Sequence, residues 1–167
     1  MEIRDIALIG ILSATITAGK LALSFIPNVE IVTFLMVIYT LVFGVKKTFL
    51  ASVIFSTTEI LIYGLSTWLL GYYIVWPLLI FVTALFNKKY KSEYVYAGIS
   101  AFWGYAFGFF FAIIESIFYG KAYGLTYWIS GIPFDLVHGT SNFIILLVLF
   151  KPVINILHRL KQSYYGI

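Results

Sequence analysis

The segment spanning residues 131–152 places an acid, a histidine and an amide inside an otherwise apolar run. If a helix starts at Pro133, whose missing N–H suits a first-turn position, Asp135, His138 and Asn142 follow at i, i+3 and i+7. Side chains at this spacing share one helix face. The segment is therefore predicted to present a single hydrogen-bonding stripe near one end of a helix.

The composition indicates what kind of element carries this stripe. Hydrophobic residues make up 62% of the chain and charged residues 11%, with a mean hydropathy of +0.99. Soluble domains carry about 25% charged residues, so the sequence predicts an all-α integral membrane protein. Cysteine is absent, which excludes a disulfide framework and a thiolate metal site, and we expect no metal and no cofactor. The net charge of +4 is interpreted as a topology signal and not as a nucleic-acid footprint.

Apolar stretches bounded by charge, proline, glycine or asparagine predict a six-transmembrane-helix bundle, with residues 1–167 as a single transmembrane domain. The helices are expected at about residues 6–26, 30–45, 48–64, 68–86, 94–119 and 133–157. The run after the N-terminal MEIRD has no small-residue cleavage site, so it is interpreted as a retained helix and not as a signal peptide.

The orientation of the bundle is predicted from the charges in its connections. If the helices alternate, one side holds Arg4, Lys46, Lys47, Lys88, Lys89, Lys91, Arg159 and Lys161, whereas the opposite side holds only Lys121. By the positive-inside rule both termini are then cytoplasmic. The outer connections would be residues 27–29, 65–67 and 120–132, the last with glycine hinges and interfacial aromatic anchors.

Ionisable residues on four of these helices are expected at a similar depth, in the outer part of the membrane. They are Lys20, Glu59, Glu115, Asp135 and His138. An ionised group facing lipid costs several kcal/mol, so these residues should face the bundle interior and compensate one another. One interpretation is structural, with Lys20 paired to Glu59 or Glu115 and a hydrogen-bonded core histidine. The other, which we favour for the set, is a polar pocket open to the outside.

Aromatic residues at the start of the fourth helix enter the membrane at the same level and would wall such a pocket. Aromatic walls with a few convergent polar groups are typical of a small-molecule site. The candidate ligand-binding residues are therefore Lys20, Glu59, Trp68, Tyr72, Trp76, Glu115, Asp135, His138 and Asn142. No catalytic residue is predicted.

Small residues recur every four positions in two helices. The first helix has Gly10, Ala14 and Ala18, and the fifth has Gly104, Gly108 and Ala112. Such stripes admit a second helix at close range. We expect one stripe to pack within the bundle and the other to face a partner protein.

With these features, the sequence resembles the substrate-binding S components of energy-coupling factor (ECF) vitamin transporters over essentially its whole length. The stretch Ala14-Thr15-Ile16-Thr17-Ala18 matches the Ala-x-x-x-Ala motif of that family's first helix. The segments PNVEIVTF from Pro27 and GIPFDLVHGTSN from Gly131 look like S components of the Firmicute type.

The resemblance implies a multi-pass protein of the bacterial plasma membrane that binds a ligand from outside, with the loop after the first helix as a gate. It also implies that Gly10, Ala14 and Ala18 dock on a transmembrane coupling subunit that works with two ATPase subunits. A cobalamin-like or other large polar vitamin is the first ligand class to consider. A pyrimidine precursor or pantothenate comes next.

Two other classes stay open as alternatives. A proton-coupled secondary transporter would use Glu59, Glu115 and His138 as a relay, although the chain shows no internal repeat. An intramembrane enzyme is disfavoured, because no HExxH zinc motif is present and Ser141 at i+3 from His138 is poorly placed for attack. The chain also lacks the G-x-x-x-x-G-K-[ST] loop, so any ATP must be hydrolysed by a partner.

Overall fold

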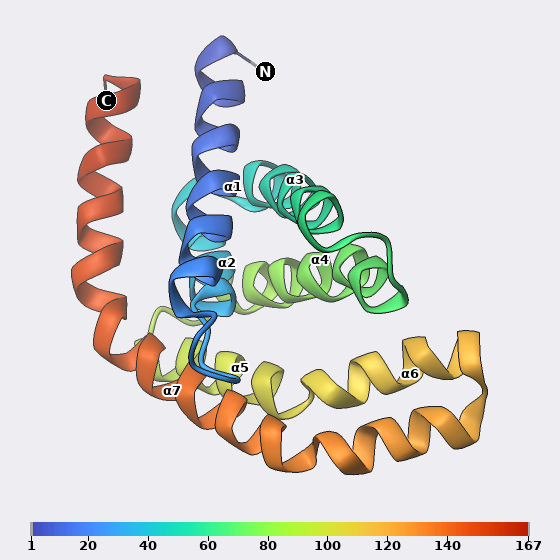
Figure 1. Ribbon diagram of the computed structural model, residues 1–167. Helices are drawn as coiled ribbons and strands as arrows, with labels where there is room; N and C mark the ends of the chain where they lie inside the picture. Colours follow the sequence, from blue (N-terminus) through green and yellow to red (C-terminus); the bar gives the residue numbers. More distant parts are fainter. Residues whose placement is uncertain (1, 167) are drawn as a thin grey trace.

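The computed structural model describes residues 2–166, and these residues form helices and no strand. The helices are α1 (Ile3–Leu23), α2 (Val32–Phe43), α3 (Val45–Tyr63), α4 (Thr67–Asn87), α5 (Glu93–Tyr105), α6 (Phe107–Tyr119) and α7 (Lys121–Tyr165) (Figure 1). The expected all-α class is confirmed. By length and composition α1, α4 and α7 can each cross a membrane, and α5 with α6 counts as a fourth span if the bent pair is taken together.

The two remaining helices depart from the pattern of a free-standing span for different reasons. Helix α3 carries Lys46, Lys47 and Glu59. Helix α2 is apolar but only 12 residues long, and nine of those residues are buried. At 1.5 Å per residue α2 is about 18 Å long, short of the roughly 30 Å hydrocarbon core of a bilayer. Other helices of the protein cover most of its surface.

The helix expected over residues 94–119 is two helices, α5 and α6, bent by 41° around Ala106. The first N–H groups of any helix lack intrahelical partners, and the methyl side chain of Ala106 cannot accept a hydrogen bond. Asp135 of α7 supplies the acceptor instead, because both of its carboxylate oxygens accept from the Gly108 N–H, at 3.0 and 3.2 Å. A carboxylate from another helix therefore caps α6 and stabilises the break.

Helix α7 begins at Lys121 and not at Pro133, so the expected outer connection at residues 120–132 is wrong. The chain reverses at Gly120, which has a φ of 90°, and α7 then packs back along α6. Ring contacts join the two helices, with centroids 5.0 Å apart for Tyr119 and Tyr123 and 5.3 Å apart for Phe109 and Trp128. This packing outweighs the helix-breaking tendency of Pro133, which lies inside α7.

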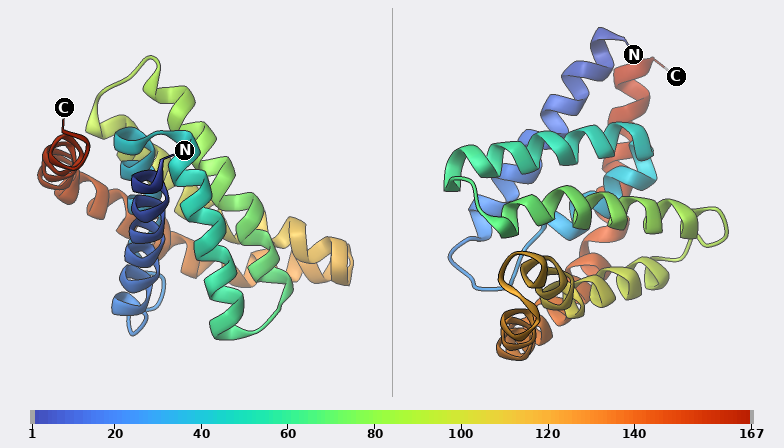
Figure 2. Two further views of the ribbon diagram at one scale, coloured as in Figure 1. Left: turned by 90° about the horizontal axis from the view of Figure 1, so that it is seen from above. Right: turned by 90° about the vertical axis from the view of Figure 1, so that its right-hand side faces the viewer.

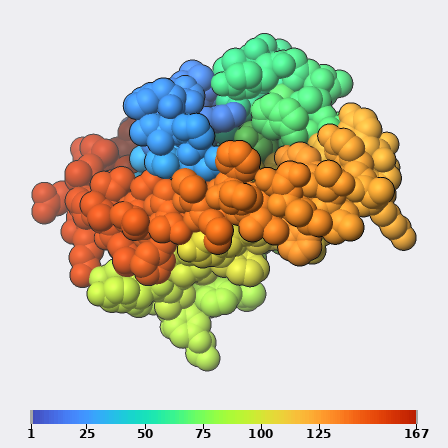
Figure 3. All heavy atoms as spheres, turned by 60° about the horizontal axis from the view of Figure 1, so that its bottom comes forward, coloured from blue at the N-terminus to red at the C-terminus, as the bar shows by residue number. Residues whose placement is uncertain are grey.

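Beyond Pro133, α7 continues as far as Tyr165, past the expected end at residue 157. It packs mainly against α5 and α6. Its first part forms a continuous band across one face of the molecule (Figure 3). The helix then turns so that its last part runs towards the end at which α1 begins (Figure 1). One helix thus borders both ends of the fold.

The two stripes of small residues have opposite environments. Gly104, Gly108 and Ala112, hereafter the buried stripe, face α7, and a Cβ atom placed on Gly104 would lie 2.6 Å from the Gly139 Cα. Gly10, Ala14 and Ala18, hereafter the exposed stripe, are uncovered, and nothing lies within 4 Å of a Cβ placed on Gly10. The buried stripe is therefore the one that packs within the bundle.

The two ends of the chain lie at the same end of the molecule (Figures 1 and 2). The Tyr164 hydroxyl donates to the Arg4 carbonyl at 2.8 Å, and the Tyr165 hydroxyl donates to Asp5 Oδ1 at 2.7 Å. Lys47, at the start of α3, forms a salt bridge of 2.7 Å with the same Asp5 oxygen. These contacts tie the first turn of α1 and the last turn of α7 to one another.

Candidate ligand-binding site

A cavity of about 150 Å³ opens towards the end of α1 that is remote from the chain termini. Its walls come from α1, the connection before α2, and α2, α4, α6 and α7. The lining residues are Lys20, Asn28, Glu30, Val32, Tyr72, Trp76, Phe107, Asp135 and His138. Five of the nine predicted ligand-binding residues are among them, namely Lys20, Tyr72, Trp76, Asp135 and His138.

The α7 wall consists of Asp135 and His138, which lie on one helix face as their spacing predicts. His138 Nε2 lies 3.1 Å from Glu30 Oε1, and its ring meets Phe107 edge-on with centroids 4.9 Å apart. Glu30 lies in the connection before α2, where its second oxygen accepts the Thr33 N–H at 2.9 Å. Burial disfavours the ionised carboxyl, but the hydrogen bonds from His138 and Thr33 outweigh burial and hold the pKa of Glu30 below its usual value.

The α1 wall is Lys20, whose ammonium pairs with the buried carboxylate of Glu59 on α3. The structure thus selects Glu59 from the two partners that the sequence indicated for Lys20. The same ammonium lies over the rings of Tyr63, Trp68 and Tyr72, at 4.9, 5.6 and 5.4 Å from their centroids. A cation held among aromatic faces is attracted by the negative potential above each ring, so these contacts add to the ion pair.

Aromatic rings form a continuous row along α4 and on to α6. Centroids lie 5.5 Å apart for Trp68 and Tyr72, 5.4 Å for Tyr72 and Trp76, and 5.8 Å for Trp76 and Phe107. The i, i+4 spacing along α4 places its three rings on one face. The indole N–H of Trp76 is buried and has no hydrogen-bond partner within residues 2–166. The row therefore gives the cavity an apolar wall.

The other four predicted residues do not line the cavity. Glu59 and Trp68 are one contact away, through Lys20. Glu115 lies further along α6, buried, and accepts a hydrogen bond of 2.7 Å from the Thr67 hydroxyl. Asn142 is buried one turn beyond His138, and neither the nitrogen nor the oxygen of its side-chain amide has a hydrogen-bond partner in the described part of the chain. Glu115 is therefore separated from the residues whose depth in the membrane it was expected to share.

Four lining residues escaped the sequence reasoning: Asn28, Glu30, Val32 and Phe107. In the sequence, Glu30 was interpreted only as the first residue of the second helix. It is nevertheless ionisable and lies near the membrane depth expected for Lys20, Asp135 and His138. Asn28 adopts a φ of 59°, and its carbonyl accepts from the Ser141 hydroxyl at 3.2 Å, which ties the connection to α7. The sequence feature that could have identified this part of the cavity wall is the polar pair Asn28 and Glu30 beside Pro27. Nothing in the sequence marked Val32 or Phe107.

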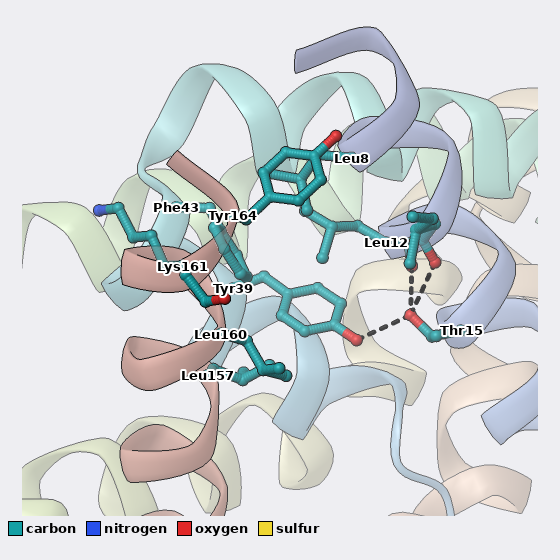
Figure 4. A pocket seen from close by; sticks show the side chains of 11 residues that line it. Leu8, Leu12, Thr15, Tyr39, Phe43, Leu157, Leu160, Lys161 and Tyr164 are labelled. Atoms are coloured by element: carbon teal, nitrogen blue, oxygen red, sulfur yellow. Dashed lines mark hydrogen bonds between the residues drawn. The ribbon is translucent and has the colours of Figure 1, made fainter. Parts of the chain in front are cut away.

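A larger groove of about 400 Å³ lies at the opposite end, between α1, α2 and the last part of α7 (Figure 4). Its walls are mostly aliphatic and aromatic, and none of the predicted ligand-binding residues lines it. Several polar groups on its walls are already engaged: Thr15 and Tyr39 bond at 2.7 Å, and Lys161 donates to the Val42 carbonyl at 2.7 Å. In a bilayer, acyl chains would fill an apolar groove of this kind. The smaller polar cavity is the better candidate for a ligand.

Comparison of the chain with protein-family models, with curated proteins and with solved structures finds no match. Among residues 2–166, no three histidine, aspartate or glutamate side chains converge as metal ligands would. The cavity therefore has to be interpreted from its own geometry, which is small, partly aromatic and partly charged.

Proposed function

We propose that this protein is the substrate-binding S component of an ECF-type importer in a bacterial plasma membrane. In this role it captures a micronutrient from outside and delivers it inward with a transmembrane coupling subunit and two ATPase subunits. The proposal includes a bundle of six spans with cytoplasmic termini, in which α2 and α3 cross as well and α5 with α6 forms one span. It assigns the chain no catalytic activity of its own.

The observation that carries the proposal is the polar cavity at the end remote from the termini. Lys20 lies 15 residues beyond Asp5 on α1, which corresponds to about 22 Å along the helix axis. With the termini in the cytoplasm, the cavity would therefore lie in the outer half of the bilayer. Buried ionisable groups at that depth are costly unless they serve a function or compensate one another.

A second observation supports docking on a coupling subunit. The exposed stripe borders a shallow groove of about 400 Å³ between α1 and α3, completed by residues such as Leu21, Ile54 and Thr58. Because the buried stripe already packs within the bundle, the exposed one is the stripe left for a helix of another protein. Close approach of two helices over small residues is a main source of association energy in a membrane.

The cavity volume bears on the ligand. About 150 Å³ is well below the roughly 300–1,000 Å³ of sites for drug-sized molecules. A pyrimidine precursor or a ligand of similar size fits this volume better than the cobalamin-like or other large polar vitamin that the sequence placed first. Pantothenate, longer and flexible, would need the cavity to widen towards its opening.

Uptake by reconstituted vesicles tests the proposal. The full chain is placed in proteoliposomes with or without an ECF coupling subunit and its ATPases, and accumulation of candidate labelled vitamins is followed with and without ATP. We expect accumulation only with the complete module and ATP. Accumulation by the chain alone, driven by a proton gradient, would instead support the secondary-transporter alternative.

A further inference from the structure

The charge around the cavity narrows the chemistry of its ligand. The positive charge of Lys20 is matched by Glu59, through the ion pair that joins them. Apart from the phenol of Tyr72, the ionisable lining residues that remain are two acids, Glu30 and Asp135, and one base, His138. Even with His138 protonated, a fully ionised wall would hold one more negative charge than positive. An unmatched charge in a medium of low polarity is costly, and a bound cation would remove that cost.

The carboxylates also differ in how fully the protein satisfies them. Glu30 accepts hydrogen bonds at both oxygens, from His138 and from the Thr33 N–H. Within residues 2–166, Asp135 receives only the Gly108 N–H, which both of its oxygens share. A carboxylate can accept about four hydrogen bonds, so Asp135 keeps most of its capacity for a ligand. This acceptor lies on the cavity wall.

The aromatic row already demonstrates that it accommodates a cation. Its first part is occupied by the protein's own ammonium, because Lys20 lies over Trp68 and Tyr72, as well as over Tyr63 of α3. The next two rings, Trp76 and Phe107, hold no cation in residues 2–166 and lie on the cavity wall with Asp135. Aromatic faces beside carboxylates are the arrangement that recognises organic cations.

Size completes the description. The cavity of about 150 Å³ equals the volume share of about five water molecules, enough for one ring with a short substituent. A planar, nitrogen-containing ring with one positive charge meets all of these requirements.

Resting on the proposed function, we propose that the ligand of this cavity is a small planar organic cation, such as a protonated amidine or an aminated nitrogen heterocycle. Its charge is held by Asp135 and Glu30, and its ring lies against Trp76 and Phe107. Large anionic or neutral vitamins are excluded as ligands by this assignment.

Three isosteric probes test the assignment on the purified full chain in detergent: benzamidine, benzamide and benzoate, which share a shape and carry a positive, zero and negative charge. Binding is followed by quenching of tryptophan fluorescence, with Trp76→Phe identifying the signal from the cavity. We expect benzamidine to bind at least about tenfold more tightly than benzoate, since the sign of the interaction with two carboxylates reverses.

Two isosteric variants locate the charge. Asp135→Asn and Glu30→Gln keep an acceptor oxygen but remove the negative charge, so each should weaken benzamidine binding several-fold and leave benzamide binding unchanged. Glu93→Gln, which removes a carboxylate paired with Lys151 elsewhere on the molecule, is the matched control and should change neither.

Benzoate or benzamide binding as tightly as benzamidine would overturn the cationic assignment, as would unchanged benzamidine binding in both cavity variants or no binding of any probe. None of these outcomes bears on the proposed function, because assembly with the coupling subunit and ATP-dependent uptake are measured separately. If assembly and uptake fail while benzamidine is still preferred, the proposed function is wrong and the cationic assignment of the cavity stands.

Discussion

The buried and exposed stripes share one sequence pattern and have opposite surroundings. Gly104 lies so close to Gly139 that a Cβ atom would come within 2.6 Å of the opposing backbone, whereas nothing lies within 4 Å of a Cβ on Gly10. A repeat of small residues therefore indicates that a helix face is flat, but not what covers it. The buried stripe is a contact between helices of the bundle, whereas the exposed stripe is a surface that a partner could cover.

The largest effect should come from adding a methyl group to the buried stripe. Gly104→Ala places a carbon against the Gly139 backbone, which cannot rotate away as a side chain would, so we expect a loss of about 1–3 kcal/mol of stability. Thermal unfolding in detergent measures it. Gly98→Ala on the same helix is the matched control, because nothing lies within 4 Å of a Cβ there. Equal unfolding midpoints for the two variants would mean that α5 and α7 are not closely packed.

How far the sequence predicts the fold depends on whether local or tertiary forces decide each element. Hydropathy placed α1 and α4 to within about three residues of their ends, because burial in an apolar medium is what defines them. The first part of α7 was missed because glycines and Pro133 indicate a connection locally, while contacts with α6 keep the segment helical. The break at Ala106 has no local signal at all, since neither proline nor glycine occupies that position.

In the candidate site, too, some residues follow from local sequence patterns and others depend on tertiary packing. Helical spacing alone placed Asp135 and His138 side by side, and aromatic spacing placed Tyr72 and Trp76 on one wall. Depth alone could not tell that Glu115 points to Thr67 and not to the cavity, because depth fixes only one of three coordinates. The sequence patterns of the two stripes are equivalent. Which stripe is exposed is therefore decided by helix packing and cannot be predicted from either pattern.

A middle-sized effect is expected at Asp135, where the buried stripe meets the cavity. Asp135→Ala removes the cap of α6 and should cost about 1 kcal/mol of stability, in addition to about 1–3 kcal/mol of ligand affinity. Asp135→Asn retains an oxygen that can accept the Gly108 N–H, so its stability should stay near that of the parent. Unfolding midpoints and ligand titration separate the two quantities, and unchanged affinity in Asp135→Ala would make this residue purely structural.

His138→Ala separates the two roles further, because the His138 side chain lines the cavity, whereas its contact with Gly104 of the buried stripe is made by the backbone. Loss of its contact with Glu30 should weaken ligand binding by about 1–3 kcal/mol while the protein still inserts into the membrane. Titration of the purified variant in detergent measures the change. A variant that binds normally would show that His138 serves only to hold Glu30.

The smallest effect should come from the same glycine-to-alanine change in the exposed stripe. Gly10→Ala fills open space in the middle of a helix, so we expect stability to stay the same or rise by up to about 1 kcal/mol. The sign is opposite to that of Gly104→Ala, and both midpoints can be compared under one set of conditions. A destabilised Gly10→Ala variant would indicate that this face is already in contact with something, such as a second copy of the chain.

We propose that the exposed stripe docks on a coupling subunit while the cavity binds ligand independently. Co-purification of the double variant Ala14→Trp, Ala18→Trp with the coupling subunit and its ATPases, together with ligand titration of the isolated variant, tests both parts of this proposal. Bulky side chains would prevent close approach of a partner helix, so assembly should be lost while unfolding midpoint and ligand affinity stay at the parent values. A double variant that assembles normally would show that the exposed stripe is not the docking face.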